Sequence, residues 1–239
     1  MKYGIQMYSL RDVAEVNLKE ALKTAAEIGY KQIEFAGFFD NSAEDIKSWL
    51  DEYGLECSGT HSLIGELINN FDETVKFHKT IGNKYYIIPG HDLSTKEKLD
   101  EFIDQCNMLA PKLREHGIEL GFHNHHIEFE IMPEGYQIHK ELEERADIFF
   151  EIDTYWAFVG KQDPVATLER LKDRIRVIHL KDGSPEGVGC SLGSGSAPVA
   201  AVKAKAQELG FGIVVERESL NPSGPEEVKR CIEYLKSLD

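Results

Sequence analysis

The chain has 239 residues, of which 41% are hydrophobic and 29% are charged, the balance of an ordinary globular protein. Its 42 acidic residues outnumber its 27 basic ones and give a formal net charge of −15. Such a surface repels phosphate backbones and anionic lipids, so we expect neither nucleic acid nor a membrane as a partner. One domain over residues 1–239 is predicted, and two domains of about 120 residues are the alternative.

The cysteines and the N-terminal segment bear on the compartment. The four cysteines are scattered and include no CxxC pair, which argues against a structural zinc site and a disulfide framework. Residues Met1–Gln6 contain no apolar signal-peptide core, and no run of about 18 apolar residues follows. We therefore expect a cytoplasmic protein.

Short apolar runs alternate with amphipathic, helix-like stretches along the chain. The runs are Tyr3–Tyr8, Gln32–Ala36, Cys57–His61, Tyr85–Pro89, Ile118–His123, Ile148–Asp153, Ile175–Leu180 and Ile213–Glu216. The stretch Leu18–Ile28 between the first two has its apolar residues on one helical stripe, and Gly29 after it suits a left-handed C-cap. This strict alternation predicts an α/β fold with a parallel sheet, and eight units predict a single (β/α)₈ TIM barrel. An open doubly wound sheet is the alternative.

A glycine- and serine-rich segment, Gly183–Pro198, follows the seventh run. Its GVGCSLG has the wrong spacing for a GxGxxG dinucleotide loop. Barrel phosphate sites commonly use the loops after strands 7 and 8, so we expect a lid that orders on substrate binding, or an anion-binding loop. A flexible surface connector is the alternative.

Histidines and acids gather where the predicted strands end. Five of the nine histidines lie at or just past the C-terminal end of a predicted strand, the end at which α/β barrels carry their active sites. These are His61, His91, His123, His125 and His179. Asp153 and Glu216 hold the same position on the sixth and eighth strands.

Strand parity predicts which of these side chains point into the barrel. Ile118, Leu120 and Phe122 share one face of the fifth strand, so the alternate positions must face inward. The same alternation applied to every strand gives the inward polar set. It comprises Gln6, Tyr8, Glu34, His61, His123, His125, Glu151, Asp153, His179, Lys181, Glu216 and Glu218.

Four inward side chains on consecutive strands suit a metal ion. Inward acids and imidazoles are costly to bury unless they are paired or bound to a metal. His123, Asp153, His179 and Glu216 offer two imidazoles and two carboxylates, which suit Mn²⁺, Co²⁺, Zn²⁺ or Mg²⁺ with positions open for substrate. We predict one divalent metal ion, with a hydrogen-bonded polar plug as the alternative.

These residues also carry a family resemblance. Six segments, which cover the chain from Tyr3 to about Leu235, resemble the sugar phosphate isomerase/epimerase family of xylose isomerase-like barrels. They are GIQMYSLRD (Gly4–Asp12), YKQIEFAG (Tyr30–Gly37), LGFHNHHIEF (Leu120–Phe129), EIDTYW (Glu151–Trp156), VIHLKD (Val177–Asp182) and IVVERE (Ile213–Glu218). The family includes ketose 3-epimerases, inosose dehydratases, hydroxypyruvate isomerases and endonuclease IV.

The resemblance implies a (β/α)₈ barrel that binds one divalent metal from strands 5 to 8. Asp153, His179 and Glu216 match the family's ligands on strands 6, 7 and 8. The family's strand-5 ligand is a glutamate that also acts as an acid/base in epimerases, whereas this chain has His123 there. Trp156 is a second departure, since epimerases often carry a histidine at that place.

We therefore predict a metal-dependent isomerase or epimerase that acts on a ketose, keto-sugar or sugar phosphate by an enediolate-type proton transfer. The alternatives are a lyase that dehydrates an inosose or 3-keto-sugar, and a sugar-binding barrel without catalysis. A nuclease is disfavoured by the charge. Glu216, His125 and Lys181 are the predicted catalytic residues. The predicted substrate contacts are Gln6, Tyr8, Glu34, His61, His91 and Trp156. The partner is a sugar-like small molecule, and a homo-oligomer is compatible with the sequence.

Overall fold

The computed structural model describes residues 2–239, in which eight parallel strands close into a barrel. In spatial order the strands are β1 (Gly4–Gln6), β10 (Gly212–Val215), β7 (Ile175–Leu180), β6 (Phe149–Asp153), β5 (Glu119–His123), β4 (Tyr85–Ile88), β3 (Glu56–His61) and β2 (Gln32–Phe35). The barrel closes where β1 pairs with β10, with Gly4 opposite Val214. The predicted TIM barrel is confirmed, and the open doubly wound sheet is wrong.

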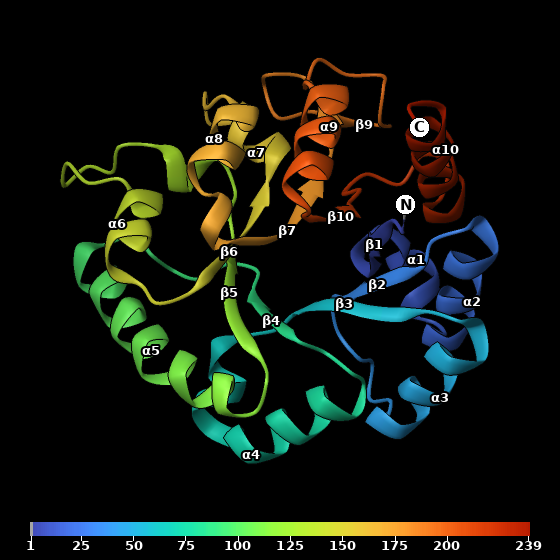
Figure 1. Ribbon diagram of the computed structural model, residues 1–239, viewed down its shortest axis with the longest axis horizontal. Helices are drawn as coiled ribbons and strands as arrows, with labels where there is room; N and C mark the ends of the chain where they lie inside the picture. The colour runs from blue at the N-terminus through green and yellow to red at the C-terminus, as the bar shows by residue number, and fades with distance from the viewer. Residues whose placement is uncertain (1) are drawn as a thin grey trace.

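Helices surround the strands on the outside of the barrel (Figure 1). They are α2 (Leu18–Ile28), α3 (Ala43–Tyr53), α4 (Ile64–Thr80), α5 (Lys96–Glu115), α6 (Ile138–Arg145), α8 (Pro164–Arg170), α9 (Val199–Leu209) and α10 (Gly224–Ser237). The short helices α1 (Arg11–Ala14) and α7 (Thr154–Val159) follow the ends of β1 and β6. Between β7 and α9, β8 (Asp182–Gly183) pairs with β9 (Gly189–Cys190). None of the helices in residues 2–239 is long and apolar enough to cross a membrane.

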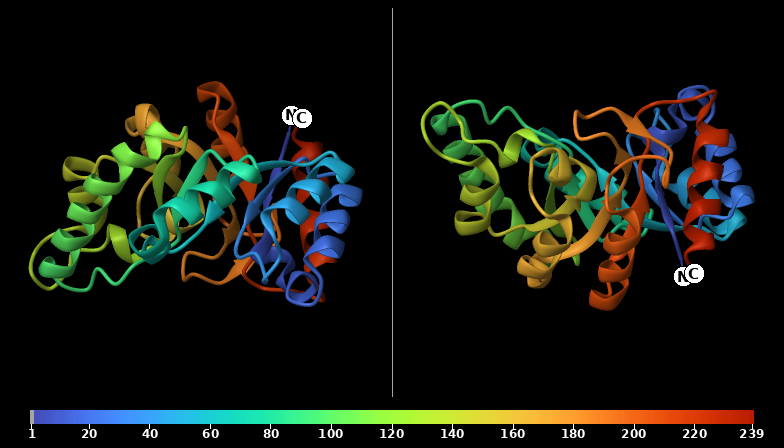
Figure 2. Two further views of the ribbon diagram at one scale, coloured as in Figure 1. Left: turned by 90° about the horizontal axis from the view of Figure 1, so that it is seen from below. Right: turned by 90° about the horizontal axis from the view of Figure 1, so that it is seen from above.

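Local sequence signals set the ends of these helices. Helix α2 begins after Asn17, whose side chain accepts a hydrogen bond from the Glu20 amide. It ends at Gly29, which has φ of 117°, a left-handed conformation that glycine adopts without steric cost. The predicted glycine cap is confirmed here. The start of β1 lies beside the C-terminal end of the chain (Figure 2), where the Tyr3 hydroxyl donates to Asp239 Oδ1 over 2.8 Å.

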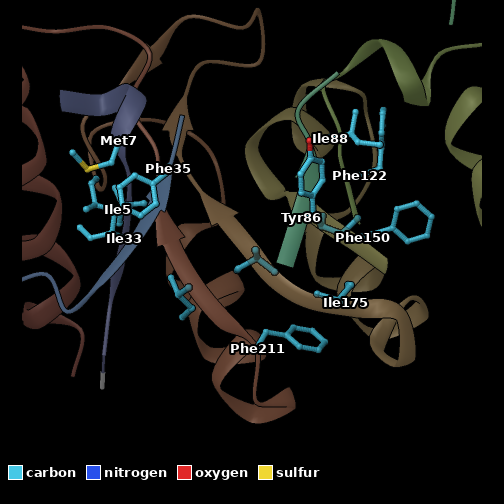
Figure 3. Packing of buried hydrophobic residues seen from close by; sticks show 14 of the residues in the cluster. Ile5, Met7, Ile33, Phe35, Tyr86, Ile88, Phe122, Phe150, Ile175 and Phe211 are labelled. Carbon is cyan, nitrogen blue, oxygen red and sulfur yellow. The ribbon is translucent and has the colours of Figure 1, made fainter. Parts of the chain in front are cut away.

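The apolar core has two parts, because alternate strand residues point to opposite sides of the barrel wall. The larger part packs between strands and helices, and includes Ile5, Ile33, Phe35, Tyr86, Ile88, Phe122, Phe150 and Ile175 (Figure 3). A smaller cluster of Ile87, Phe149, Val177 and Val214 packs separately, on the alternate positions of four strands. The Phe149 ring lies over Gly121, where an added Cβ would sit 2.3 Å from the ring. This apolar layer, which we call the barrel floor, lies below the polar residues at the strand ends.

Candidate metal centre and active site

Four side chains from the C-terminal ends of neighbouring strands converge inside the barrel. His123 ends β5, Asp153 ends β6, His179 lies near the end of β7, and Glu216 directly follows β10. All four are buried, and their ligand atoms lie within 4.8 Å of one another. The inward orientation predicted for β5, β6, β7 and β10 is confirmed by this convergence. The predicted metal ligands therefore form one cluster.

The unsatisfied atoms of this cluster fit a divalent cation. Both ring nitrogens of His123 are buried and have no hydrogen-bond partner among the described residues, and Asp153 Oδ2 has only ion-pair contacts, with Lys181 and His123. His123 Nε2 lies 3.4 Å from Asp153 Oδ2, and His179 Nδ1 lies 3.1 Å from Glu216 Oε2. Buried polar atoms without partners are costly, and a cation coordinated by them removes that cost. Two nitrogen and two oxygen donors fit Zn²⁺, Mn²⁺ or Co²⁺.

The start of helix α7 orients the carboxylate of Asp153. Its Oδ1 accepts hydrogen bonds from the amides of Tyr155 at 3.0 Å and Trp156 at 2.9 Å, as an N-cap does. Only Oδ2 of Asp153 is therefore free to bind a metal ion. The side chain of Asn124 also binds the main-chain N–H and C=O of Asp153. This aspartate is thus held from both its main chain and its side chain.

A second layer of buried charge lies beside the cluster. His61 Nε2 lies 2.6 Å from Glu151 Oε2, and His179 Nε2 lies 2.6 Å from Glu34 Oε1. Gln6 donates to Glu34 Oε1 over 2.6 Å. His61 and Glu151 form, with His123 and His179, a second group whose atoms could hold a metal. Gln6, Glu34 and His61 therefore lie where the sequence places them, although Gln6 and Glu34 are wholly buried.

The pKa values of the Glu34 and Glu151 carboxyls are shifted in opposite directions. Burial raises the pKa of Glu151 well above its ordinary value, and the charge of Glu34 raises it further. Burial also opposes ionisation of Glu34, but His179 and His61 outweigh it and lower its pKa to about 2. Burial lowers the pKa of His61 to about 3, so this imidazole is neutral. The pair therefore carries one proton between its two carboxyls.

A cavity of about 330 Å³ opens above the cluster at the barrel mouth. Its lining residues are Tyr8, His61, Pro89, His123, His125, Trp156, Glu216 and Glu218. An adjoining hollow of about 370 Å³ shares Tyr8, His61, Pro89 and Glu216 with it. Tyr8 is 44% exposed and lies at the rim, so its predicted inward position is only partly right. The cavity is large enough for a monosaccharide-sized molecule.

The ring of His125 lies at this mouth, 5.0 Å from the ring of His123. Burial lowers the pKa of His125, and the neighbouring His123 lowers it further, so the imidazole is neutral and can accept a proton. Its main-chain N–H donates to Glu128 Oε2 over 2.8 Å, which fixes the turn after β5. The predicted base is therefore placed beside the cavity.

Lys181, which directly follows β7, is the buried cation of the site. Its Nζ lies 3.2 Å from Asp153 Oδ2 and 3.1 Å from Glu216 Oε2, and also binds Glu218. The Trp156 ring lies 4.9 Å from the same ammonium, and its Nε1 donates to Glu218 over 3.1 Å. Burial opposes the charge of Lys181, but the three carboxylates outweigh it and raise its pKa. The charge of Lys181 likewise helps to hold the pKa of Glu216 well below 4.5, although burial would raise it.

One predicted substrate contact is misplaced. His91 is exposed, stacks on Phe102 of α5 with ring centroids 4.8 Å apart, and lines neither hollow. The reason is that β4 ends at Ile88, so His91 lies three positions past the strand end, in the segment that leads to α5. Arg217 points outward, as parity predicts, and its Nε pairs with Glu227 Oε1 at 3.0 Å.

The glycine-rich segment is folded onto one carboxylate. Asp182, itself buried, accepts hydrogen bonds from the amides of Gly183, Gly193, Gly195 and Ala197 at 2.8 to 3.1 Å. These four donors are occupied and do not form an anion-binding loop. The ordering of the segment by substrate stays a prediction.

Three contributors to the site were not assigned a role from the sequence. Asn124 holds Asp153, Glu128 holds the turn at His125, and Glu218 binds both Lys181 and Trp156. Of the three, only Glu218 could have been found from the sequence, because strand alternation places its side chain inside the barrel. Another cavity, of about 540 Å³, is lined by residues such as Gln32, Tyr85 and Gly212 at the strands' N-terminal ends. α/β barrels do not use that end for catalysis.

Comparisons with known proteins agree with this geometry. The family model described as xylose isomerase-like TIM barrel matches residues 22–238. The chain is 25% identical over 276 aligned residues to the inosose dehydratase of Mesomycoplasma hyopneumoniae, covering 94% of this chain and 89% of that protein.

Comparison with solved structures finds proteins of the same fold. A sugar phosphate isomerase/epimerase from Parabacteroides distasonis superposes with a TM-score of 0.84 at 26% identity, over 99% of this chain and 93% of that one. The probable 3-DHS dehydratase of petrobactin synthesis from Bacillus anthracis has a TM-score of 0.81 at 14% identity, over 99% of both chains, and shows the fold alone. This chain therefore belongs to the xylose isomerase-like TIM barrel family, and its structural neighbours include sugar phosphate isomerase/epimerases.

Proposed function

We propose that this protein is a metal-dependent isomerase or epimerase, which removes a proton from the carbon beside a carbonyl of a keto-sugar. The observation that carries the proposal is the four-residue cluster of His123, Asp153, His179 and Glu216 below a cavity lined by imidazoles and carboxylates. These four residues would hold a divalent metal, which would supply Lewis-acid stabilisation of negative charge on a substrate oxygen.

The protein's own residues supply the proton transfers. His125 has a neutral imidazole at the cavity and is the base that takes the carbon-bound proton. Glu216 also faces the cavity and is the second candidate acid/base. The ammonium of Lys181 can donate a hydrogen bond to a substrate oxygen on which charge develops. Trp156 forms an apolar wall beside His125, with ring centroids 6.2 Å apart.

The charges at the mouth favour an unphosphorylated substrate. Lys181 already faces three carboxylates, and Arg217 points away to Glu227. Among the described residues that line the cavity there is no arginine, and Glu216 and Glu218 add negative charge. A phosphate would meet repulsion here, whereas the hydroxyls of a neutral sugar or cyclitol can donate to these carboxylates.

A second candidate is dehydration of an inosose or 3-keto-sugar. The inosose dehydratase relative, which aligns with 94% of this chain, favours it. The imidazole of His123 in place of the family's strand-5 glutamate counts against a two-carboxylate epimerase, because this chain lacks the second carboxylate at that position. The same proton removal would then be followed by loss of a neighbouring hydroxyl as water, with a protonated side chain supplying the proton.

Proton exchange in D₂O tests both candidates at once. We would incubate metal-loaded protein with a panel of ketoses, inososes and 3-keto-sugars and follow each by NMR. Deuterium at a substrate carbon with a new isomer supports the first candidate, and deuterium with loss of water supports the second. If no member of the panel exchanges a carbon-bound proton, the sugar-binding alternative replaces both.

Metal content is measured on the same preparations. We expect about one divalent ion per chain in protein purified without chelator, and none in Asp153→Ala. Asp173→Ala, which removes an exposed carboxylate after α8, is the control and should keep the ion. Protein that folds but holds no ion in any of the three would refute the metal site.

A further inference from the structure

The ammonium of Lys181 lies among the atoms that a metal would bind. Asp153 offers only Oδ2, since its Oδ1 caps α7, and that oxygen lies 3.2 Å from Lys181 Nζ. Glu216 Oε2, the oxygen that faces His179, lies 3.1 Å from the same Nζ. Two of the four metal-ligand atoms are thus already neutralised by a side chain of the protein.

A divalent ion and this ammonium cannot both keep these contacts without strong repulsion. Metal–oxygen distances are about 2.0–2.2 Å for Zn²⁺, so an ion bound to both oxygens would lie only a few ångströms from Nζ. Like charges at such a distance inside a protein repel strongly even at a moderate effective dielectric, and the double charge of the ion increases the repulsion. One of the two cations must therefore move.

Lys181 has alternative contacts outside the metal cluster. Its third carboxylate partner, Glu218, is not part of the metal cluster, and its side chain is 44% exposed at the mouth. Trp156 holds Glu218 through its Nε1 and presents its ring 4.9 Å from Nζ. An ammonium that leaves Asp153 and Glu216 can therefore keep a carboxylate and an aromatic face, which is a favourable cation–π position.

We propose that Lys181 is an internal cation that occupies the metal site of this protein and is displaced onto Glu218 and Trp156 when a divalent ion binds. The inference rests on the proposed metal site. Lys181 then stabilises the metal-free barrel, because it keeps three carboxylates paired, and it sets how tightly the ion is held. It also couples metal binding to the mouth, since Glu218 and Trp156 line the cavity.

Titration with Zn²⁺ alone, followed by calorimetry, tests the competition. Lys181→Met keeps the aliphatic stem and removes the charge, so we expect it to bind Zn²⁺ about 10- to 100-fold more tightly than the unaltered protein. Without metal the variant should melt at a lower temperature, and Zn²⁺ should raise its melting temperature by more. Lys203→Met is the matched control, because Lys203 is also buried and pairs with a carboxylate, that of Asp239.

Fluorescence of Trp156 reports the displacement itself. The chain has two tryptophans, so Trp49→Phe leaves Trp156 as the only one. Zn²⁺ should shift its emission in the Trp49→Phe protein, and Lys181→Met on that background should bind Zn²⁺ with a much smaller shift. This reporter works in the lysine-containing protein even if Lys181→Met does not fold.

The outcomes separate the two proposals. Equal or weaker Zn²⁺ binding by folded Lys181→Met, or no emission shift on Zn²⁺ binding with Lys181 present, overturns the displacement and leaves the metal site intact. Zn²⁺ binding to Lys181→Met but not to the unaltered protein also overturns the displacement, because Lys181 would then block the site and not yield it to the ion. No Zn²⁺ binding to either overturns the metal site, and this inference with it.

Discussion

The side chain of Asn124 makes a two-point contact with the main chain of Asp153. Asn124 Oδ1 accepts from the Asp153 amide at 3.0 Å, and its Nδ2 donates to the Asp153 carbonyl at 3.2 Å. Strand β5 ends at His123. The side-chain amide of Asn124, the next residue, therefore extends the hydrogen bonding between β5 and β6 beyond the end of the strand. Two metal ligands on adjacent strands are thereby held at a fixed spacing.

We expect Asn124→Ala to lower metal affinity by about 10- to 100-fold, the usual effect of losing a residue that orients a ligand. Titration calorimetry measures this directly. Asn107→Ala is a matched control, because Asn107 makes the same kind of contact with the main chain at Arg145 and Asp147, away from the cluster. Equal metal affinity in the two variants would show that Asp153 does not depend on Asn124.

His125→Gln should keep both metal and fold and slow substrate proton exchange by about 10²–10⁴-fold, the usual contribution of a positioned base. Exchange in D₂O and metal analysis of the same sample measure the two effects. His126→Gln changes the neighbouring imidazole, which does not line the cavity, and should leave exchange near its original rate. Unchanged exchange in His125→Gln would make Glu216 the first candidate for the base.

His123→Glu is expected to keep the metal, since it replaces a nitrogen ligand with an anionic oxygen at the same place. It would also restore the carboxylate that family members carry on strand 5. His123→Gln, which offers a weaker neutral ligand, should bind the ion less tightly. Elemental analysis and metal titration of both variants test this, and unchanged metal affinity in His123→Gln would count against His123 as a ligand.

Acid should destabilise the fold partly through His78. This imidazole of α4 is buried, and burial lowers its pKa to about 4. Its Nδ1 lies 3.0 Å from Asn83 Nδ2 and 3.3 Å from Thr60 Oγ1. Because the unfolded chain takes up a proton near pH 6.5 and the folded one only near pH 4, stability is lost as the pH falls through this window.

The expected contribution of His78 is a loss of about 2 kcal/mol of unfolding free energy between about pH 7.5 and 5. Urea unfolding at the two pH values measures it. His78→Gln should be less stable at the higher pH but lose about 2 kcal/mol less on acidification. Parallel losses in the two proteins would mean that His78 does not remain neutral in the folded state.

Asp182→Asn should loosen the glycine-rich segment, residues 183–198. The change replaces a charged acceptor of four amide hydrogen bonds with a neutral side chain that has one acceptor oxygen, at a cost of about 2–4 kcal/mol. Hydrogen exchange across the segment should rise. Asp163→Asn is the control, since Asp163 caps α8 and asparagine caps helices equally well. Unchanged hydrogen exchange in Asp182→Asn would mean that contacts other than those of Asp182 hold the glycine-rich segment in place.

The barrel and the inward residues could be predicted because each depends on a local property. Alternation of side chains along a strand is fixed by backbone geometry, so the apolar positions of β5 determine where His123 points. Helix ends such as Gly29 are equally local. His91 was expected at the mouth only because it follows a strand end, whereas its exposed position against Phe102 depends on the path of the segment before α5, which no local pattern encodes.

The contacts across strands could not be predicted. Lys181 and Glu216 are 35 positions apart, and Asn124 and Asp153 are 29 apart. Their meeting depends on the stagger between strands, which no sequence pattern of a single strand encodes. Parity placed Lys181 inside the barrel, but only the packed structure shows that its ammonium shares two carboxylates with the predicted metal.

The barrel floor has a consequence for how this protein could acquire a different specificity. Phe149 fills the space over Gly121, and Ile87, Val177 and Val214 complete a layer that separates the site from the strands' N-terminal ends. A bulkier residue at Gly121 would collide with that ring, and a smaller one at Phe149 would open a void at a cost of about 3–5 kcal/mol. Substitutions cannot easily change the depth of the substrate cavity, whereas the exposed rim at Tyr8 and Glu218 tolerates substitution. Relatives with larger or smaller substrates should differ at the rim and keep the floor.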